Sequence, residues 1–169
     1  MFMQKIVLIL VLIVSSSLSA AEFDLNMKVK NLQGETASLK EYVGKGNWTL
    51  VMFWETTCAI CKQQEPEYAK FYEEHKDKDA EVLAVSIDGT DKIKLVDEYK
   101  KEYSLPYPVL VTDKSEIREK FLDATKERFR GTPTYLLFSP EGELKAAQPG
   151  MLLATSVENY IAKQSENNQ

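Results

Sequence analysis

Apolar residues in this 169-residue chain fall into short runs separated by polar, amphipathic stretches. Short apolar runs bounded by charged residues, glycine or proline are typical of buried strands. They predict strands at residues 48–54, 81–87, 107–111 and 135–138. Between the runs, apolar side chains recur every three or four positions, as on one face of a helix. This spacing predicts helices at residues 59–76, 91–103, 114–122 and 154–164.

Antiparallel hairpins are expected at both margins of the sheet. Residues 23–39 predict a β-hairpin, followed by a helical turn that ends at Gly44. Ser139-Pro140-Glu141-Gly142 is a turn sequence, so residues 143–147 should pair with the strand before it. Strands that alternate with helices predict an α/β fold with parallel pairing at its centre.

The first 21 residues have the pattern of a secretory signal peptide. Lys5 precedes the apolar run 6–14, residues 15–21 are small apart from Leu18, and cleavage is expected after Ala21 or Ala20. An uncleaved membrane anchor is the alternative, because the serine-rich extension brings the apolar stretch near the roughly 20 residues needed to cross a bilayer. Either form predicts a periplasmic or other extracytoplasmic location, where a disulfide persists.

The remaining residues have the length of one domain. We expect residues 22–165 to form this domain and residues 166–169 to be a polar tail. Lysine and arginine number 21 against 26 aspartates and glutamates, which gives a net charge of -5. An acidic chain without a basic stripe is not expected to bind nucleic acid. No dimerisation region is visible, so a monomer is expected.

The only two cysteines, Cys58 and Cys61, come just after the apolar run at residues 48–54. A Cys-x-x-Cys pair where a strand meets a helix suits reversible dithiol–disulfide chemistry, and the helix start favours a thiolate on Cys58. A purely structural disulfide is the alternative, although so short a loop adds little stability. A zinc site would need carboxylates or a second chain, because the only histidine is His75. No metal and no cofactor is expected.

A second motif lies downstream, where Gly131-Thr132-Pro133-Thr134 introduces an apolar strand. Together with Trp54, the cysteine pair and Pro66, which lies eight residues after Cys58, this motif resembles the thioredoxin fold. The resemblance implies a central mixed β-sheet flanked by helices. It also implies that Pro133 is cis and faces the cysteine pair.

The segment between the cysteines and Pro133 indicates which type of thioredoxin-like protein the chain resembles, because it holds an additional strand–helix unit at residues 82–103. This inserted unit and the N-terminal β-hairpin segment resemble the TlpA/ResA type of exported thioredoxin-like proteins, over about residues 23–163. Members are commonly reductants in bacterial envelopes and often serve cytochrome c assembly. The resemblance therefore implies reduction of disulfides in envelope proteins, with electrons from a membrane-bound thiol donor. Oxidases and isomerases share the motif, so the direction stays open.

The resemblance also implies roles for individual residues. Cys58 is expected to attack a substrate disulfide, and Cys61 is expected to release the product. Thr132, Pro133 and Trp54 are expected to bind substrate, with the backbone of Thr132 pairing with an extended segment.

Two positions depart from the family pattern. Met52 stands where thioredoxin has a buried aspartate, and Gln64 stands where ResA-like proteins have a glutamate. In the family both carboxylates help proton transfer, so no acid–base residue is assigned to this chain. Glu55 and Glu65 are near in sequence and would oppose a thiolate, which favours a reductant over a strong oxidant.

Two other functions fit parts of the pattern. A thiol peroxidase would share the inserted unit, but its usual Pro-x-x-x-Thr-x-x-Cys pattern meets Val51 and Glu55 here. A copper or haem-delivery chaperone could use the same fold. Copper carriers of this kind generally add a distant histidine and a wider cysteine spacing, whereas His75 lies in the helix after the cysteines.

Overall fold

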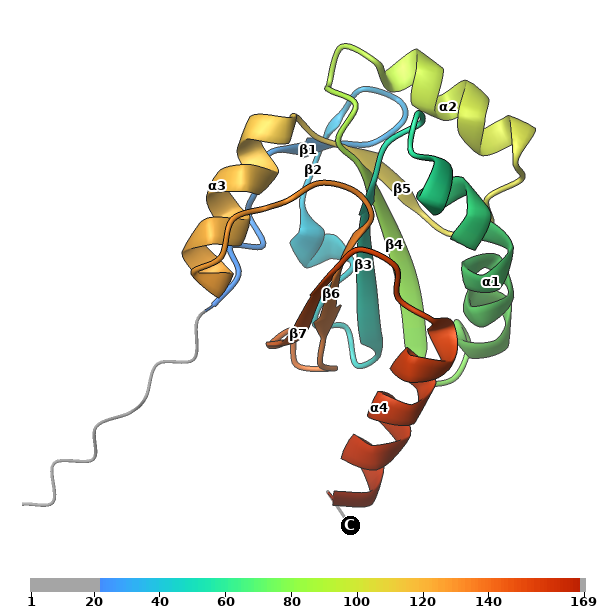
Figure 1. Ribbon diagram of the computed structural model, residues 1–169, viewed down its shortest axis with the longest axis vertical. Helices are drawn as coiled ribbons and strands as arrows, with labels where there is room; N and C mark the ends of the chain where they lie inside the picture. Colours follow the sequence, from blue (N-terminus) through green and yellow to red (C-terminus); the bar gives the residue numbers. More distant parts are fainter. Residues whose placement is uncertain (1–21, 168–169) are drawn as a thin grey trace, which may run out of the picture.

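The computed structural model describes residues 22–167 and arranges them around one mixed β-sheet (Figure 1). In sheet order its strands are β2 (Thr36–Ala37), β1 (Val29–Lys30), β5 (Val109–Val111), β4 (Ala80–Ser86), β3 (Trp48–Trp54), β6 (Thr134–Phe138) and β7 (Leu144–Pro149). β3, β4 and β5 are parallel, and the remaining pairings are antiparallel. The expected hairpins, β1–β2 and β6–β7, therefore lie at the two margins of the sheet.

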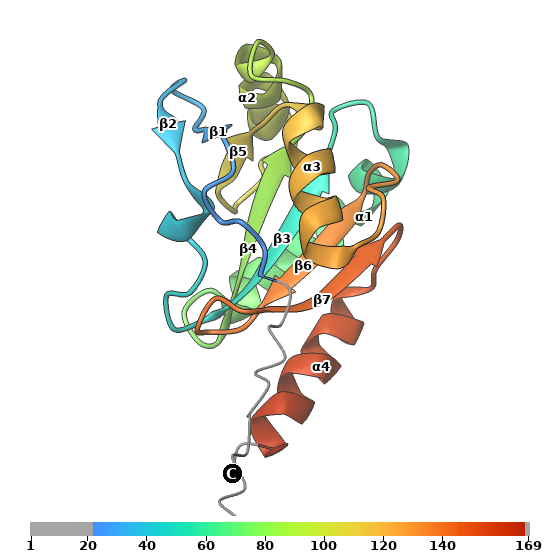
Figure 2. The ribbon, with the colours of Figure 1, turned by 90° about the vertical axis from the view of Figure 1, so that its left-hand side faces the viewer.

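Helices cover both faces of this sheet. They are α1 (Ala59–His75), α2 (Ile93–Glu102), α3 (Lys114–Thr125) and α4 (Ala154–Asn167), with a short 3-10 helix at Leu39–Glu41. Figure 1 shows α3 on one side of the sheet and α1 and α2 on the other, and Figure 2 shows α4 leaving from the end of β7. Within residues 22–167, none of these helices combines the length and the apolar character that a membrane span requires.

The alternation of side chains along β3 divides the interior into two cores. Leu50, Met52 and Trp54 point to the face that α1, α2 and α4 cover, whereas Val51 and Phe53 point to the face of α3. All seven residues of β3 are buried. The continuous apolar run is therefore explained by helices on both faces of the strand.

The direction of the strands positions the functional site. β3, β4 and β5 run parallel, so the loops that follow them leave from the same edge of the sheet. β6 runs antiparallel to β3 with Thr134 opposite Phe53, so the residues before β6 also lie at this edge. The loop that leads to the cysteines and the loop that holds Pro133 are thereby brought together.

Two helices extend three residues beyond their predicted ends. α3 continues to Thr125 and ends where Lys126 adopts a left-handed backbone (φ 62°). α4 continues to Asn167, so the first two residues of the expected polar tail are helical. The Ser165 hydroxyl donates to the Ile161 carbonyl at 3.1 Å, so a polar sequence still completes the last turns. The predicted signal peptide, residues 1–21, lies outside the described residues.

Candidate redox site

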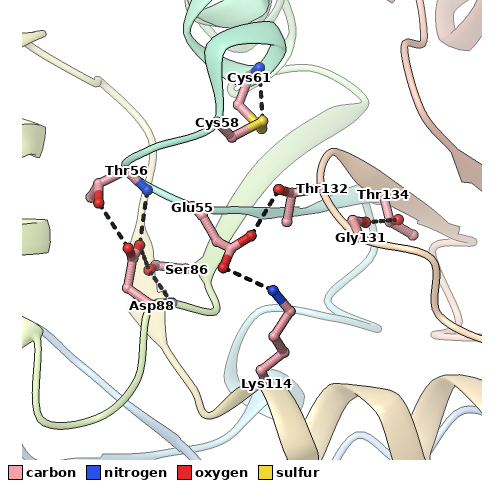
Figure 3. Close-up of polar contacts among 10 residues, drawn as sticks. All are labelled: Glu55, Thr56, Cys58, Cys61, Ser86, Asp88, Lys114, Gly131, Thr132 and Thr134. Atoms are coloured by element: carbon pink, nitrogen blue, oxygen red, sulfur yellow. Dashed lines mark hydrogen bonds and ion pairs between the residues drawn. A yellow bond between two sulfur atoms is a disulfide. The ribbon is translucent and has the colours of Figure 1, made fainter.

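The two cysteines form a disulfide at the start of α1, with 5.3 Å between their Cα atoms. Cys58 is the N-cap residue, and its sulfur accepts a hydrogen bond from the Cys61 N–H at 3.1 Å (Figure 3). Cys58 is half-buried, whereas only 2% of Cys61 is exposed. A partner molecule can therefore reach the sulfur of Cys58 more readily than that of Cys61. The first turn of α1 holds no acidic residue, so the positive end of the helix dipole acts on the pair without compensation from that turn.

Hydrogen bonds to a neighbouring loop fix the segment between β3 and Cys58. The Cys58 N–H donates to the Glu55 carbonyl at 3.0 Å, which closes a turn. The carboxylate of Asp88, just after β4, accepts from the Thr56 N–H at 2.9 Å and from the Thr56 hydroxyl at 2.7 Å. The Ser86 hydroxyl donates to the same carboxylate at 2.7 Å. Backbone donors that a strand end leaves unpaired are thus satisfied by the next loop (Figure 3).

The loop before β6 carries the second motif. The peptide bond between Thr132 and Pro133 is cis, as the resemblance implies, and Gly131 adopts a φ of 137° that favours glycine. The Thr134 hydroxyl donates to the Gly131 carbonyl at 2.6 Å, and the Gly150 N–H donates to the Pro133 carbonyl at 2.8 Å. A shallow, open pocket lies between this loop and the end of β7. Its lining residues are Arg130, Gly131, Thr132, Pro133, Pro149 and Gly150.

The side chain of Glu55 joins the cysteine loop to the loop of Pro133. One carboxylate oxygen accepts from the Thr132 hydroxyl at 3.1 Å, and the other lies 3.1 Å from the Lys114 ammonium of α3 (Figure 3). Glu55 was expected to oppose a thiolate, and the structure pairs its charge with the Lys114 ammonium, which reduces that effect. The sequence contained one signal that Glu55, Lys114 and Thr132 could meet. Each of them lies close to the end or the start of a buried strand, at the same edge of the sheet.

Trp54 lies beneath the site rather than on its surface. Only 1% of its surface is exposed, and its ring centroid lies 5.0 Å from that of Tyr99 on α2. With no face open to a partner, Trp54 supports the cysteine helix from the core.

Neutral residues occupy the positions of the missing family carboxylates. Met52 and Gln64 are both buried. The Gln64 amide donates to the Leu152 carbonyl at 2.6 Å, and its oxygen accepts from the Tyr135 hydroxyl at 2.8 Å. Gln64 thus connects α1 to β6 and to the segment before α4.

A buried carboxyl group nevertheless lies on the helix of the cysteines. Glu65, four residues after Cys61, is 6% exposed and accepts a hydrogen bond from the Tyr99 hydroxyl at 2.6 Å. Burial raises the pKa of Glu65 above its ordinary value, and this effect outweighs the Tyr99 hydrogen bond and the nearby Lys62 charge, which both lower it. Sequence spacing placed Glu65 near the pair but did not show that it is buried.

The histidine lies at the opposite end of α1. His75 closes the helix, 14 residues after Cys61, which corresponds to about 21 Å along a helix axis. Its ring stacks on Phe71 and lies 2.7 Å from the Asp79 carboxylate, and the side chain is half-buried. Within residues 22–167, no three His, Cys, Asp or Glu side chains are grouped so that they could hold a metal ion.

The sheet order, the flanking helices and the disulfide at the helix start define a protein of the thioredoxin fold. Solved structures with this fold superpose on the chain. A thiol:disulfide interchange protein from a Bacteroides species is 25% identical, and the match covers 80% of this chain and 86% of that one with a TM-score of 0.63. The exposed lipoprotein thioredoxin of Streptococcus pneumoniae is 26% identical, with coverage of 80% and 97% and a TM-score of 0.61.

The chain belongs to the AhpC/TSA family, whose model matches residues 19–147. The thiol-disulfide oxidoreductase ResA of Oceanobacillus iheyensis is 30% identical over 143 residues, which cover 85% of this chain and 69% of that protein. Several further relatives carry the same description, among them the ResA of Bacillus subtilis. The chain is therefore a thiol–disulfide oxidoreductase of the ResA type, as its cysteine pair and fold indicated.

Proposed function

We propose that this protein is an exported reductase that cleaves disulfides in proteins of the bacterial envelope, with Cys58 as nucleophile and Cys61 as resolving cysteine. The observation that carries the proposal is the difference in exposure within one redox pair. Cys58 caps the helix and is half-buried, while Cys61 is 2% exposed behind it. A thiolate at the open position can attack a partner, and the covered sulfur is reached only from within the chain.

The reaction then proceeds in two exchanges. The Cys58 thiolate attacks one sulfur of a substrate disulfide, so that a mixed disulfide forms and one substrate thiolate leaves and takes up a proton. Cys61 loses its proton and attacks the Cys58 sulfur, which releases the second substrate thiolate. The substrate gains two electrons and two protons, and the Cys58–Cys61 disulfide of the described structure is the oxidised product. A membrane-bound dithiol donor would reduce it again.

The loop of Pro133 provides the surface for the substrate. Thr132 is half-buried beside the pocket, and its backbone can pair with an extended segment as an added strand does. Ile60, two residues after Cys58, is 44% exposed. Met151, which is 52% exposed, follows Gly150, whose N–H donates to the Pro133 carbonyl. Exposed apolar side chains next to the cysteine pair and next to the residue that contacts Pro133 would add contact area for an unfolded or extended partner.

The cellular role rests on the leader and on the resemblance. A basic residue, an apolar run and small residues at positions 1–21 support export by a signal peptide, cleaved or retained as an anchor. The likeness to the ResA type supports a role in cytochrome c maturation. We also propose that the protein acts as a monomer. Labelled protein found in the cytoplasmic fraction of the producing cell would contradict export.

The direction of the reaction is a matter of potential. No charged residue stands between Cys58 and Cys61, so the helix start is the main feature that stabilises the thiolate. We therefore expect a reduction potential nearer the −270 mV or so of thioredoxin than the −120 mV or so of the strong oxidant DsbA. Equilibration of the protein with glutathione buffers measures this value. A potential near that of DsbA would make the protein an oxidase.

Turnover tests the assignment of the cysteines. The chain without residues 1–21, with dithiothreitol as donor, should reduce insulin, and Cys58→Ser should abolish this activity. Cys61→Ser is the matched variant, because it keeps the nucleophile and should accumulate a mixed disulfide that Cys58→Ser cannot form. Activity that survives Cys58→Ser, or a mixed disulfide formed only by Cys58→Ser, would overturn the proposed roles.

The same protein separates the other functions. In the peroxidase pattern the positions of proline and threonine are Val51, buried in β3, and Glu55, bonded to Lys114 and Thr132. Slow peroxide consumption is therefore expected, and rapid consumption would support a peroxidase. His75 lies about 21 Å from Cys61 along α1 and cannot join the cysteines on a copper ion in this arrangement.

A further inference from the structure

Side-chain hydrogen bonds connect the loops at the redox edge of the sheet. Together with the short chain segments inside each loop, they form a closed ring. The edge ring consists of Glu55, Thr56, Asp88, Thr90, Asp113 and Lys114. Thr56 donates to Asp88, and Thr90 donates to Asp113 through its N–H at 2.9 Å and its hydroxyl at 3.2 Å. Lys114, adjacent to Asp113, returns to Glu55 and closes the ring.

Glu55 is the member of the edge ring that touches the proposed substrate loop. Its second oxygen accepts from the Thr132 hydroxyl, and Thr132 directly precedes Pro133. Its own carbonyl accepts from the Cys58 N–H, so the same residue is also one turn from the reactive sulfur. The loop of Pro133 and the loop of Cys58 are thus connected through one side chain (Figure 3).

The position of Lys114 indicates a purpose beyond helix formation. It is the first residue of α3, where the helix dipole disfavours a cation. The ion pair with Glu55 offsets this unfavourable position. The two side chains are 24% and 41% exposed for Glu55 and Lys114, so water screens the pair only in part.

We propose that Glu55 is a positioning residue of the redox site: its carboxylate holds the Thr132 side chain beside the cysteine loop, and the Lys114 ammonium neutralises it there. The inference rests on the proposed roles of Cys58 and Thr132. It assigns two separate effects to one group, since the contact with Thr132 acts on substrate binding and the charge acts on the thiolate.

The charge balance predicts shifts of opposite sign. Glu55→Gln keeps an oxygen for the Thr132 hydroxyl but leaves the Lys114 cation unpaired, which favours the Cys58 thiolate and lowers its pKa. Lys114→Met leaves the carboxylate unpaired and raises that pKa. We expect each shift to be about 0.5–1 unit, given one charge roughly a turn away. The double variant Glu55→Gln/Lys114→Met should return near the wild-type value, with Lys62 and Glu65 retained throughout.

The reduction potential should follow the same order. A lower thiolate pKa stabilises the reduced pair, so Glu55→Gln should raise the potential and Lys114→Met should lower it. A three- to tenfold change in the glutathione equilibrium corresponds to about 15–30 mV in this two-electron couple. Both quantities are measured on the full chain without residues 1–21, the pKa from the thiolate absorbance as a function of pH.

Substrate binding separates the contact from the charge. Glu55→Ala removes the acceptor of the Thr132 hydroxyl as well as the charge, so it should raise KM for insulin several-fold above that of Glu55→Gln. Both variants should show the same potential. Rescue of KM by glutamine but not by alanine is the result that a merely structural ion pair would not produce.

An ion pair elsewhere on the same helix is the matched control. Lys120 of α3 lies 3.0 Å from Asp24, and their side chains are 21% and 44% exposed, so the pair is similar in geometry and burial. Asp24→Asn and Lys120→Met should leave the Cys58 pKa, the potential and KM unchanged. Shifts of the same sign in Glu55→Gln and Lys114→Met, or equal shifts in the control variants, would overturn the inference. A wild-type protein that fails to reduce insulin would instead refute the proposed function.

Discussion

Replacement of Glu65 by glutamine is expected to stabilise the oxidised protein at neutral pH and to change it little in acid. Glu65 is 6% exposed, and its carboxyl accepts a hydrogen bond from the Tyr99 hydroxyl at 2.6 Å. Glutamine has the same shape and a similar helix propensity, and its oxygen can accept the same hydrogen bond. The substitution therefore removes the charge and keeps the packing.

The pH dependence follows from the direction of the pKa shift. Burial raises the pKa of Glu65 in the folded protein above the ordinary glutamate value of 4.5. The folded state thus binds the proton more tightly than the unfolded chain does. The corresponding stability is fully present below pH 4.5 and is lost as the pH rises through the folded pKa. At pH 7, above the ordinary glutamate pKa, burial of the acidic side chain is a cost that glutamine does not carry.

The size of the effect can be worked out from the contacts. A nearly buried carboxylate costs several kcal/mol of desolvation, and a hydrogen bond to a charged group returns about 1.5–3 kcal/mol. Lys62, the cation that lowers the Glu65 pKa, is exposed and adds little. The remaining cost is about 1–2 kcal/mol at pH 7. For a chain of this size such a gain raises the unfolding midpoint by about 3–6 °C.

Thermal unfolding of the oxidised protein at pH 7 and at pH 4 measures both parts of the prediction. Glu74→Gln is the control on the same helix. The Glu74 side chain is 50% exposed, and its carboxylate forms an exposed ion pair with Lys70 at 3.8 Å. The control should shift stability by less than about 0.5 kcal/mol at either pH. A loss of stability in Glu65→Gln at pH 7, or an equal gain at pH 4 and pH 7, would refute the reasoning from desolvation.

Two further predictions compare a pair of buried tyrosines and a pair of exposed glycines. The buried Tyr107 hydroxyl has no hydrogen-bond partner within residues 22–167, so Tyr107→Phe should leave stability unchanged or raise it by about 1 kcal/mol in urea unfolding. Tyr68→Phe should lower stability by about 1–2 kcal/mol, because its hydroxyl donates to the Leu152 carbonyl at 2.6 Å, and an equal response of both tyrosines would contradict this account. Gly44→Ala should cost more than Gly46→Ala in thermal unfolding. Both glycines have positive φ, where an alanine costs about 1–2 kcal/mol. Only at Gly44 would the added Cβ also meet backbone, 3.2 Å from the Glu141 carbonyl oxygen.

The sequence by itself determined the elements of this fold. The run 48–54 is continuously apolar, and all seven residues of β3 are buried between two helical layers. Apolar spacing placed α1 to within one residue at its end, and Ser139-Pro140-Glu141-Gly142 placed the hairpin of β6 and β7. These features depend on residues a few positions apart, so a local pattern contains the information. The pattern does not mark where an element ends, since polar residues can continue a helix, as they do in α4.

The redox pair was likewise a local feature. Cys58 and Cys61 are three residues apart at a strand–helix junction, and the resemblance added Pro133 as the element that accompanies them. That Thr132 contacts the cysteine loop through Glu55, 77 residues earlier, was not visible in any pattern. Sequence spacing assigned Glu55 an opposing charge without its partner Lys114, which lies 59 residues away.

Only the tertiary structure decided which polar side chains meet at the redox edge and which are removed from water. The parallel order of β3, β4 and β5 brings the ends of three strands to one side, and the antiparallel β6 starts there. Glu55 and Glu65 have the same chemistry in the sequence, yet one is paired with a cation and the other is buried against Tyr99. Their difference arises because burial and pairing depend on strand order and register across the whole chain, whereas periodicity reports only which side of its own element a residue occupies.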